Sequence, residues 1–171
     1  ERLLDVAEQL FARGSIAGVT SRDITEAAGQ RNTSAISYHF GSREGLLRAL
    51  LARRGEPIDE ARGVARATFG MQLQVPDLVE CLVLPYCSSL TTAGGRSYLR
   101  IVAQLRGTFA AWRVQSDAGT TQHLAQILEE LESRAKGEAA IRRERIVALI
   151  MLLTALTAER ARNIDEEVPL G

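Results

Sequence analysis

A short segment near the start of the sequence gathers small polar and basic side chains. They are Arg31, Asn32, Thr33, Ser34 and Ser37. Arginine can form two parallel hydrogen bonds to a guanine edge, and asparagine can do the same with adenine. The chemistry open to this segment is therefore hydrogen bonding to the bases of duplex DNA. Asn32 is equally suited to capping the start of a helix, so both interpretations stay open.

Two short helices joined by a tight turn must position these side chains. Thr20 precedes Asp23 by three residues, which is the spacing of a capping box, and Gly29 ends the helix that the box begins. The next helix is expected to run from about Asn32 to Tyr38. This order predicts a helix-turn-helix, in which the outward side chains of the second helix enter the major groove.

The elements on either side of this pair are also predicted to be helical. An apolar stripe at helical spacing indicates a first helix, which a glycine ends at residue 14. The stripe comprises Leu3, Val6, Ala7, Leu10 and Phe11. Ser42 is suited to cap a long fourth helix over about Arg43 to Phe69, which ends near Gly70.

The net charge of the whole chain gives no sign of a nucleic-acid partner, because 21 basic side chains balance 21 acidic ones. Residues 22–54, however, carry six arginines against three acidic residues. This local excess of positive charge is compatible with contacts to DNA phosphates. A solvated helix face explains it at least as well, so the charge alone does not decide the function.

Three runs of the N-terminal sequence carry a further signal. They are Val19-Thr20-Ser21-Arg22-Asp23-Ile24, Ala27-Ala28-Gly29 and Tyr38-His39-Phe40-Gly41-Ser42-Arg43-Glu44-Gly45-Leu46. Together they resemble the DNA-binding domain of the TetR family of bacterial transcriptional regulators. We therefore expect an all-α chain of about nine helices. A three-helix DNA-binding domain is expected over residues 1–45, and a helical ligand-binding and dimerisation domain over residues 46–171.

The resemblance also implies roles for single residues. Thr20 matches the cap of the second helix, which binds a phosphate, and Tyr38 and His39 match a pair that contacts the DNA backbone. Arg43 is placed to bind a flanking phosphate. His39 could instead be packed between the two domains. The expected DNA-binding residues are Thr20, Ser21, Arg22, Arg31, Asn32, Thr33, Ser34, Ser37, Tyr38, His39 and Arg43.

Beyond about residue 70 the sequence predicts further helices. An apolar helix is expected over residues 77–93, with a kink at Pro85 because proline lacks the N–H of one helical hydrogen bond. Gly94-Gly95 then separates it from a helix over about 96–105. Two last helices are expected over about 118–136 and 138–163, after a short aromatic segment.

The proline and its aromatic neighbours could enclose a pocket for a small-molecule effector. Aromatic side chains at helical spacing more often belong to a core, so the two interpretations stay open. The expected ligand-binding residues are Tyr86, Tyr98, Gln104, Thr108, Phe109 and Trp112.

The last predicted helix is apolar on nearly every side between Ile146 and Leu156. One face can pack on its own domain, and the other needs a cover, which a second copy of the chain would provide. A helix enclosed by its own chain is the alternative. The expected residues of a homodimer interface are Leu124, Ile127, Leu128, Leu131, Ile146, Ile150, Leu153 and Thr157.

Other classes of function find little support. No catalytic, metal-binding or nucleotide-binding motif is present, so we expect no catalytic residues, no metal and no cofactor. The longest stretch without ionisable residues on the last helix has thirteen residues, fewer than the roughly twenty needed to cross a bilayer. Cys81 and Cys87 are too far apart on one helix for a disulfide, which indicates reduced thiols and a cytoplasmic protein. Because the sequence begins at Glu1, residues before it are expected to be missing.

The sequence therefore favours a ligand-responsive homodimer that binds a double-stranded DNA operator. Within this class we expect a repressor that a small molecule releases, with no enzymatic activity and no contact with membranes. The alternative is a helical ligand-binding protein or enzyme that uses a cavity of the second domain without binding DNA. Sequence-specific binding to duplex DNA at physiological salt would separate the two.

Overall fold

The computed structural model describes residues 1–30, 34–70, 72–105 and 121–168, and its regular structure in these ranges is entirely helical. The all-α class is therefore confirmed, with eight α-helices and one short 3-10 helix in the described residues against about nine helices expected. They are α1 (Arg2–Arg13), α2 (Ser21–Ala27), α3 (Ala35–Phe40), α4 (Arg43–Phe69), α5 (Val75–Cys87), the 3-10 helix η1 (Ser88–Thr91), α6 (Ala93–Gln104), α8 (Gln122–Arg134) and α9 (Ala139–Asp165).

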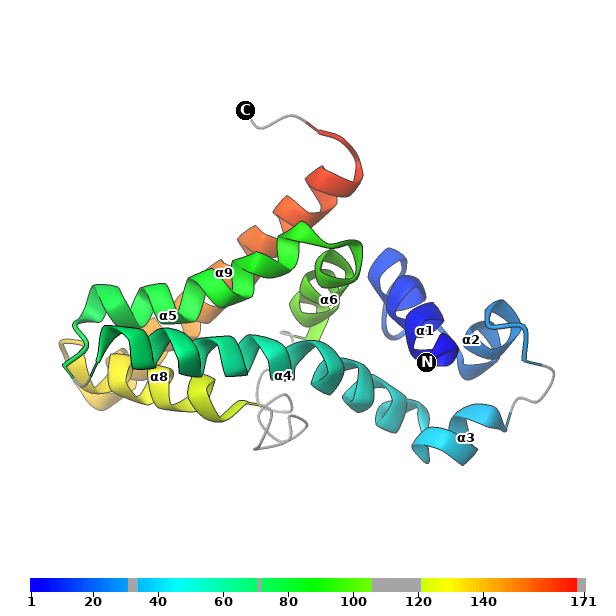
Figure 1. Ribbon diagram of the computed structural model, residues 1–171, viewed down its shortest axis with the longest axis horizontal. Helices are drawn as coiled ribbons and strands as arrows, with labels where there is room; N and C mark the ends of the chain where they lie inside the picture. Colours follow the sequence, from blue (N-terminus) through cyan, green and yellow to red (C-terminus); the bar gives the residue numbers. More distant parts are fainter. Residues whose placement is uncertain (31–33, 71, 106–120, 169–171) are drawn as a thin grey trace.

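Helices α1, α2 and α3 form an N-terminal unit at one end of the molecule (Figure 1). Its centre is built from apolar side chains that solvent does not reach, among them Phe11, Ile24 and Ile36. The start of α4 contributes Leu46, Leu47 and Leu50 to the same core, and α6 contributes Ile101 together with its C-cap residue Leu105. The N-terminal unit is therefore completed by residues from the rest of the chain.

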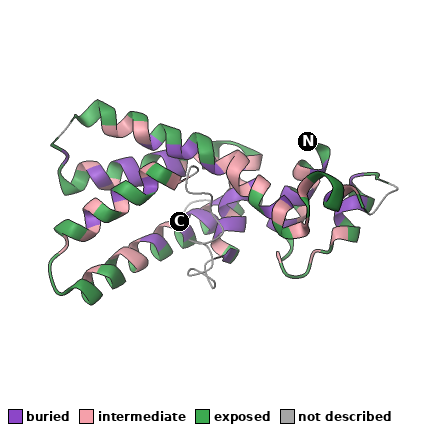
Figure 2. Ribbon diagram, turned by 90° about the horizontal axis from the view of Figure 1, so that it is seen from below, coloured by how far each residue is buried: buried purple, intermediate pink, exposed green. Residues whose placement is uncertain are grey.

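The remaining helices form a second, larger unit, through which α4 continues (Figure 1). One of its cores joins α5 and α8 to α9 through Leu82, Ile127 and Ile150. Another joins α5, α6 and α9 around Tyr86, Tyr98 and Ala161. Buried residues face the interior between the helices of this unit and exposed residues face outward (Figure 2). No described helix is long and apolar enough to span a membrane.

Local signals in the sequence explain where several helices begin and end. The Ser42 side chain accepts a hydrogen bond from the Gly45 N–H and begins α4, and Gly70, with φ +84°, follows the end of α4 at Phe69, as predicted. The third helix is shifted from the predicted range, since it covers Ala35–Phe40. Gly41, with φ +74°, ends it two residues later than expected.

The region from α5 to α6 differs from the prediction. The helix expected over 77–93 ends at Cys87, and the 3-10 helix η1 takes up residues 88–91. Gly94 and Gly95, expected to separate two helices, lie in the first turn of α6 after the cap Thr92. A Cβ atom at Gly95 would lie 2.1 Å from the carbonyl oxygen of Ser89. The glycines therefore serve close packing rather than a break in the helix.

Candidate nucleic-acid interface

The start of α2 is fixed by the predicted capping box. The Asp23 N–H donates to the Thr20 hydroxyl oxygen at 3.2 Å, and the Thr20 N–H and hydroxyl each donate to the Asp23 carboxylate at 2.8 Å. These hydrogen bonds lower the pKa of Asp23, and the bond from the Thr20 backbone N–H has the larger effect. Thr20 and Arg22 are exposed here, and Ser21 is half-buried. Arg22 pairs with Glu26 one turn later, at 2.8 Å.

The short helix α3 is anchored by one side chain and exposes most of the others. Ile36 is 1% exposed and packs in the N-terminal core, whereas Ser34, Ser37, Tyr38 and His39 are exposed. Tyr38 is 85% exposed, which is unusual for a tyrosine. Its ring lies edge-on to that of His39, with 5.0 Å between ring centroids.

The exposure of His39 does not favour the alternative in which it packs between two domains. Phe40, which follows it, is half-buried and packs against the N-terminal core. Arg31, Asn32 and Thr33, predicted to contact bases, lie outside the described residues. Four polar or aromatic side chains predicted to bind DNA, at the N-cap of α3 and on α3 itself, are therefore exposed.

Arg43 is engaged inside the N-terminal unit. Its Nε donates to the carbonyl oxygen of Val19 at 2.9 Å, and its Nη2 donates to the carbonyl oxygen of Ile16. The guanidinium carbon also lies 5.3 Å from the centroid of the Phe11 ring. Arg43 thus ties the start of α4 to the loop between α1 and α2. These contacts favour a structural role over the predicted phosphate contact.

Of the residues expected to bind a ligand, the three that the structure describes do not come together in one pocket. Tyr86 and Tyr98 pack against each other in the core, with ring centroids 6.4 Å apart. Burial raises the pKa of Tyr98 to about 12. The Gln104 amide bonds the loop after α1, donating to the Phe11 carbonyl and accepting from the Ile16 N–H, each at 2.8 Å. Thr108, Phe109 and Trp112 lie outside the described residues.

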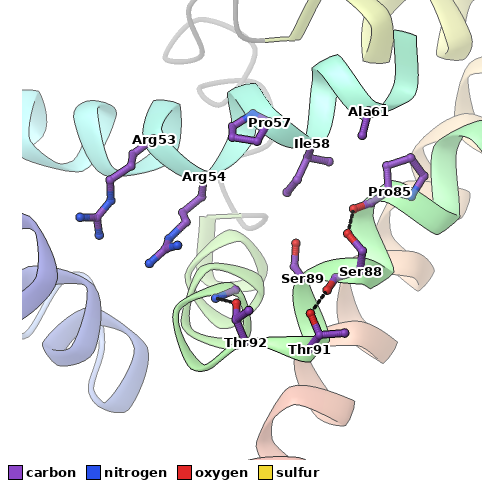
Figure 3. A pocket seen from close by; sticks show the side chains of 11 residues that line it. Arg53, Arg54, Pro57, Ile58, Ala61, Pro85, Ser88, Ser89, Thr91 and Thr92 are labelled. Atoms are coloured by element: carbon purple, nitrogen blue, oxygen red, sulfur yellow. Dashed lines mark hydrogen bonds between the residues drawn. The ribbon is translucent and has the colours of Figure 1, made fainter. Parts of the chain in front are cut away.

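An open cleft lies instead between α4, the end of α5, η1 and the start of α6 (Figure 3). Its volume is about 240 Å³. The lining residues are Arg53, Arg54, Pro57, Ile58, Ala61, Pro85, Ser88, Ser89, Thr91, Thr92 and Gly95. Among them only Pro85 belongs to the pocket predicted from the sequence. The sequence signal for this cleft is the pair of adjacent arginines before a proline inside α4.

A buried polar contact braces α4 against α8. The Asp59 carboxylate accepts the N–H groups of His123 and Leu124, both at 2.8 Å, and so caps the start of α8. Arg62 lies 3.6 Å from the same carboxylate, and burial lowers its pKa. Sequence periodicity gave no hint of this contact, because its partners are more than sixty residues apart.

The predicted dimer residues mostly face their own chain. Leu124, Ile127, Leu131 and Ile150 are buried in the core of the second unit, and Thr157 is also buried, so these side chains face the interior of their own chain and their role in a dimer stays a prediction. Leu128, Ile146 and Leu153 are half-buried against the same core. The stripe was identified correctly as apolar, but its cover is the chain itself. The exposed apolar residues of α9 are Ala139, Ala140 and Ile141 in its first turn, and Ala148, Met151, Leu152, Ala155 and Leu156 further along.

Comparisons with known proteins agree with this architecture. Residues 3–50 match the family described as bacterial regulatory proteins, tetR family, which confirms the predicted resemblance. No curated protein matches the chain. A solved structure described as "Crystal structure of superantigen PfiT" is similar at 20% identity with a TM-score of 0.50, over 93% of this chain and 92% of that one. At this identity the likeness shows the fold alone.

Proposed function

We propose that this chain is a DNA-binding transcriptional repressor that a small molecule releases from its operator, since its residues 3–50 match the tetR family of bacterial regulatory proteins. The observation that carries the proposal is the exposed surface of α3 on a helix-turn-helix whose preceding helix has a capping box. In this arrangement α3 enters the major groove, and the start of α2 meets the phosphate backbone.

The side chains for this contact divide by their chemistry. Ser34 and Ser37 can exchange hydrogen bonds with base edges, together with Arg31, Asn32 and Thr33. Tyr38 and His39 lie at the end of α3 and reach the backbone of the groove wall, and Thr20 offers its cap to a phosphate. The Arg22 guanidinium, although paired with Glu26, is 77% exposed and can exchange that carboxylate for a phosphate.

Two copies of the chain form the complete DNA-binding unit. A twofold dimer presents two α3 helices to successive major grooves about 34–36 Å apart. The exposed face of α9 supports such a dimer, since Leu152 and Leu156 are 58% and 60% exposed. Ala148 and Ala155 lie on the exposed side as well, and small residues let a second helix approach closely. We propose this face in place of the residues predicted from the sequence.

The proposed division at residue 45 assigns DNA binding to the first domain and effector binding and dimerisation to the second. Helix α4 joins the two without a linker, because it begins at Arg43 and runs to Phe69. A shift of α4 in the second domain therefore moves the base of α3. This continuity supports control of DNA binding by an effector.

Selection from random duplex DNA, followed by fluorescence anisotropy at physiological salt, tests the function. We expect one enriched, twofold-symmetric sequence. Tyr38→Ala should lower the affinity for it, whereas Val64→Ala, a matched change of an exposed apolar residue on α4, should not. Ligand binding without any affinity for duplex DNA would instead favour the alternative, a helical ligand-binding protein or enzyme.

A further inference from the structure

We propose that the cleft between α4, η1 and α6 binds a small organic acid, whose carboxylate takes Arg53 and Arg54 from Glu8 of α1. The proposal names the chemistry and the site of the effector, and it rests on the proposed function for its regulatory consequence. Its binding step stands on the geometry of the cleft alone.

The two arginines already hold a carboxylate. Arg54 bonds the Glu8 side chain with both Nε and Nη2, at 2.7 Å each, and the Arg53 Nη2 bonds it at 2.8 Å. This paired geometry is the one by which guanidinium groups select carboxylates. The Arg53 Nε is buried and has no acceptor among the residues that the structure describes. The arginine end of the cleft is thus built to bind an anionic oxygen group.

The rest of the cleft suits the body of a small amphipathic molecule. Pro57, Ile58 and Ala61 of α4 offer apolar surface, with Pro85 beyond them, and the side chains of η1 lie below (Figure 3). The volume of about 240 Å³ is below the roughly 300–1,000 Å³ of pockets for drug-sized ligands. A monocarboxylate with a short apolar chain or a single ring fits this description.

Glu8 couples ligand binding in the cleft to the position of α1. Its side chain is 5% exposed, and among the described residues its ion-pair partners are Arg53 and Arg54. A ligand carboxylate that draws the arginines into the cleft would leave a buried, unpaired charge on α1, which is strongly unfavourable. Helix α1 must then shift to hydrate Glu8. Because α1 packs in the same core as α2 and α3, this shift reaches the DNA-binding surface.

Direct binding to the full chain without DNA tests the site. Isothermal titration calorimetry with sodium benzoate and sodium hexanoate should show binding. The affinity for benzamide and hexanamide should be lower by a factor of about ten or more, because these amides lack the charge. Arg54→Gln should weaken benzoate binding about tenfold or more. Arg48→Gln, an exposed arginine on the same helix outside the cleft, should leave it unchanged.

Glu8→Gln separates a ligand site from a purely structural ion cluster. This variant removes the carboxylate that holds both arginines and leaves the exposed Asp5 as a partner of Arg53, so benzoate should bind several-fold more tightly, roughly the effect of one charge-assisted bond. If loss of Glu8 or Arg54 prevents folding, Thr91→Glu provides a second test. It adds a negative charge at an exposed position of the cleft and should weaken benzoate binding, while Thr68→Glu, also exposed but outside the cleft, should not.

Three results would overturn the proposal. One is the absence of carboxylate-dependent binding throughout the millimolar range. Another is unchanged binding by Arg54→Gln together with Thr91→Glu, and the third is weaker binding by Glu8→Gln. The regulatory step is tested by adding benzoate to the complex with the selected operator, and a bound ligand that leaves DNA affinity unchanged would refute that step. Failure to bind any duplex would refute the proposed function while calorimetry still decided the site.

Discussion

Arg43 illustrates how the surroundings of one side chain determine its role. The family resemblance places it beside a phosphate, but its guanidinium bonds the carbonyl groups of Val19 and Ile16 and lies over Phe11. No sequence pattern could reveal these contacts, because every residue has a backbone carbonyl and the acceptors therefore leave no mark in the sequence. The position of Arg43 at the start of α4 could be predicted, but the direction of its side chain could not.

Arg43→Gln is therefore expected to destabilise the N-terminal unit. Loss of two hydrogen bonds from a charged donor should lower the free energy of unfolding by about 2 kcal/mol. The salt dependence of DNA binding should stay the same, since no phosphate contact is lost. Urea denaturation and anisotropy at several salt concentrations measure both, with Arg48→Gln as the control. Unchanged stability with a salt slope lower by about one would restore the phosphate role.

Asp23 gives the capping box a pH dependence. Hydrogen bonds from Thr20 keep its pKa in the folded protein below the ordinary value of 3.8. The ionised carboxylate therefore stabilises the fold above that value, and the contribution is lost as the pH falls through the lowered pKa.

Wild type should thus exceed Asp23→Asn in stability near neutral pH, and the difference should shrink as the pH falls below 3.8. Denaturation by urea across this range measures the effect. Thr20→Val serves as a second variant, because it removes the two bonds of the Thr20 hydroxyl and keeps the bond from the Thr20 N–H to the Asp23 carboxylate. A difference that does not change with pH would show that ionisation of Asp23 is irrelevant to the cap.

At the level of elements, local signals located helix ends well. Thr20, Ser42 and Gly70 mark boundaries through bonds and backbone angles that depend on near neighbours. The predicted start of α6 was too late because its glycines allow the close approach of Ser89 and Arg54, which lie on other elements. Helical periodicity likewise found the apolar stripes of α8 and α9, but it could not tell a core of the same chain from a second copy.

Gly95→Ala tests the packing explanation. Alanine is the better helix former by about 1 kcal/mol. Its Cβ would nevertheless lie 2.1 Å from the carbonyl oxygen of Ser89, so we expect a net loss of about 1–3 kcal/mol in stability. Thermal and urea denaturation would measure this loss. A gain in stability would show that η1 moves aside easily and that the glycine is only incidental.

For the whole molecule, the exposed face of α9 makes the oligomeric state testable. The double variant Leu152→Glu and Leu156→Glu should be monomeric, because two buried, unpaired carboxylates per chain oppose association. Sedimentation at micromolar concentration measures the state, and anisotropy should show that affinity for the full operator falls much more than affinity for a half-site. Val64→Glu is the matched control, since Val64 is also exposed but lies on α4. A dimeric double variant would place the interface elsewhere.

The candidate site was only partly accessible from the sequence. The residues of α3 predicted to face DNA follow from a local motif, and the structure exposes those that it describes. The cleft does not follow from a local motif, because it joins α4 to residues 24 or more positions later in the chain. The predicted ligand residues are mostly aromatic, whereas the cleft is lined by two arginines, by apolar side chains of α4 and by hydroxyl side chains of η1.

The sharing of the N-terminal core has a consequence for how such a protein can be cut and recombined. Ile101 of α6 and its C-cap residue Leu105 complete a core that otherwise belongs to α1, α2, α3 and the start of α4. A fragment ending with α4 would lack these two side chains and would leave part of this core open to water. The N-terminal unit therefore cannot be moved to another protein by cutting the chain at the end of α4. A functional chimera would have to carry α6 along with the first four helices.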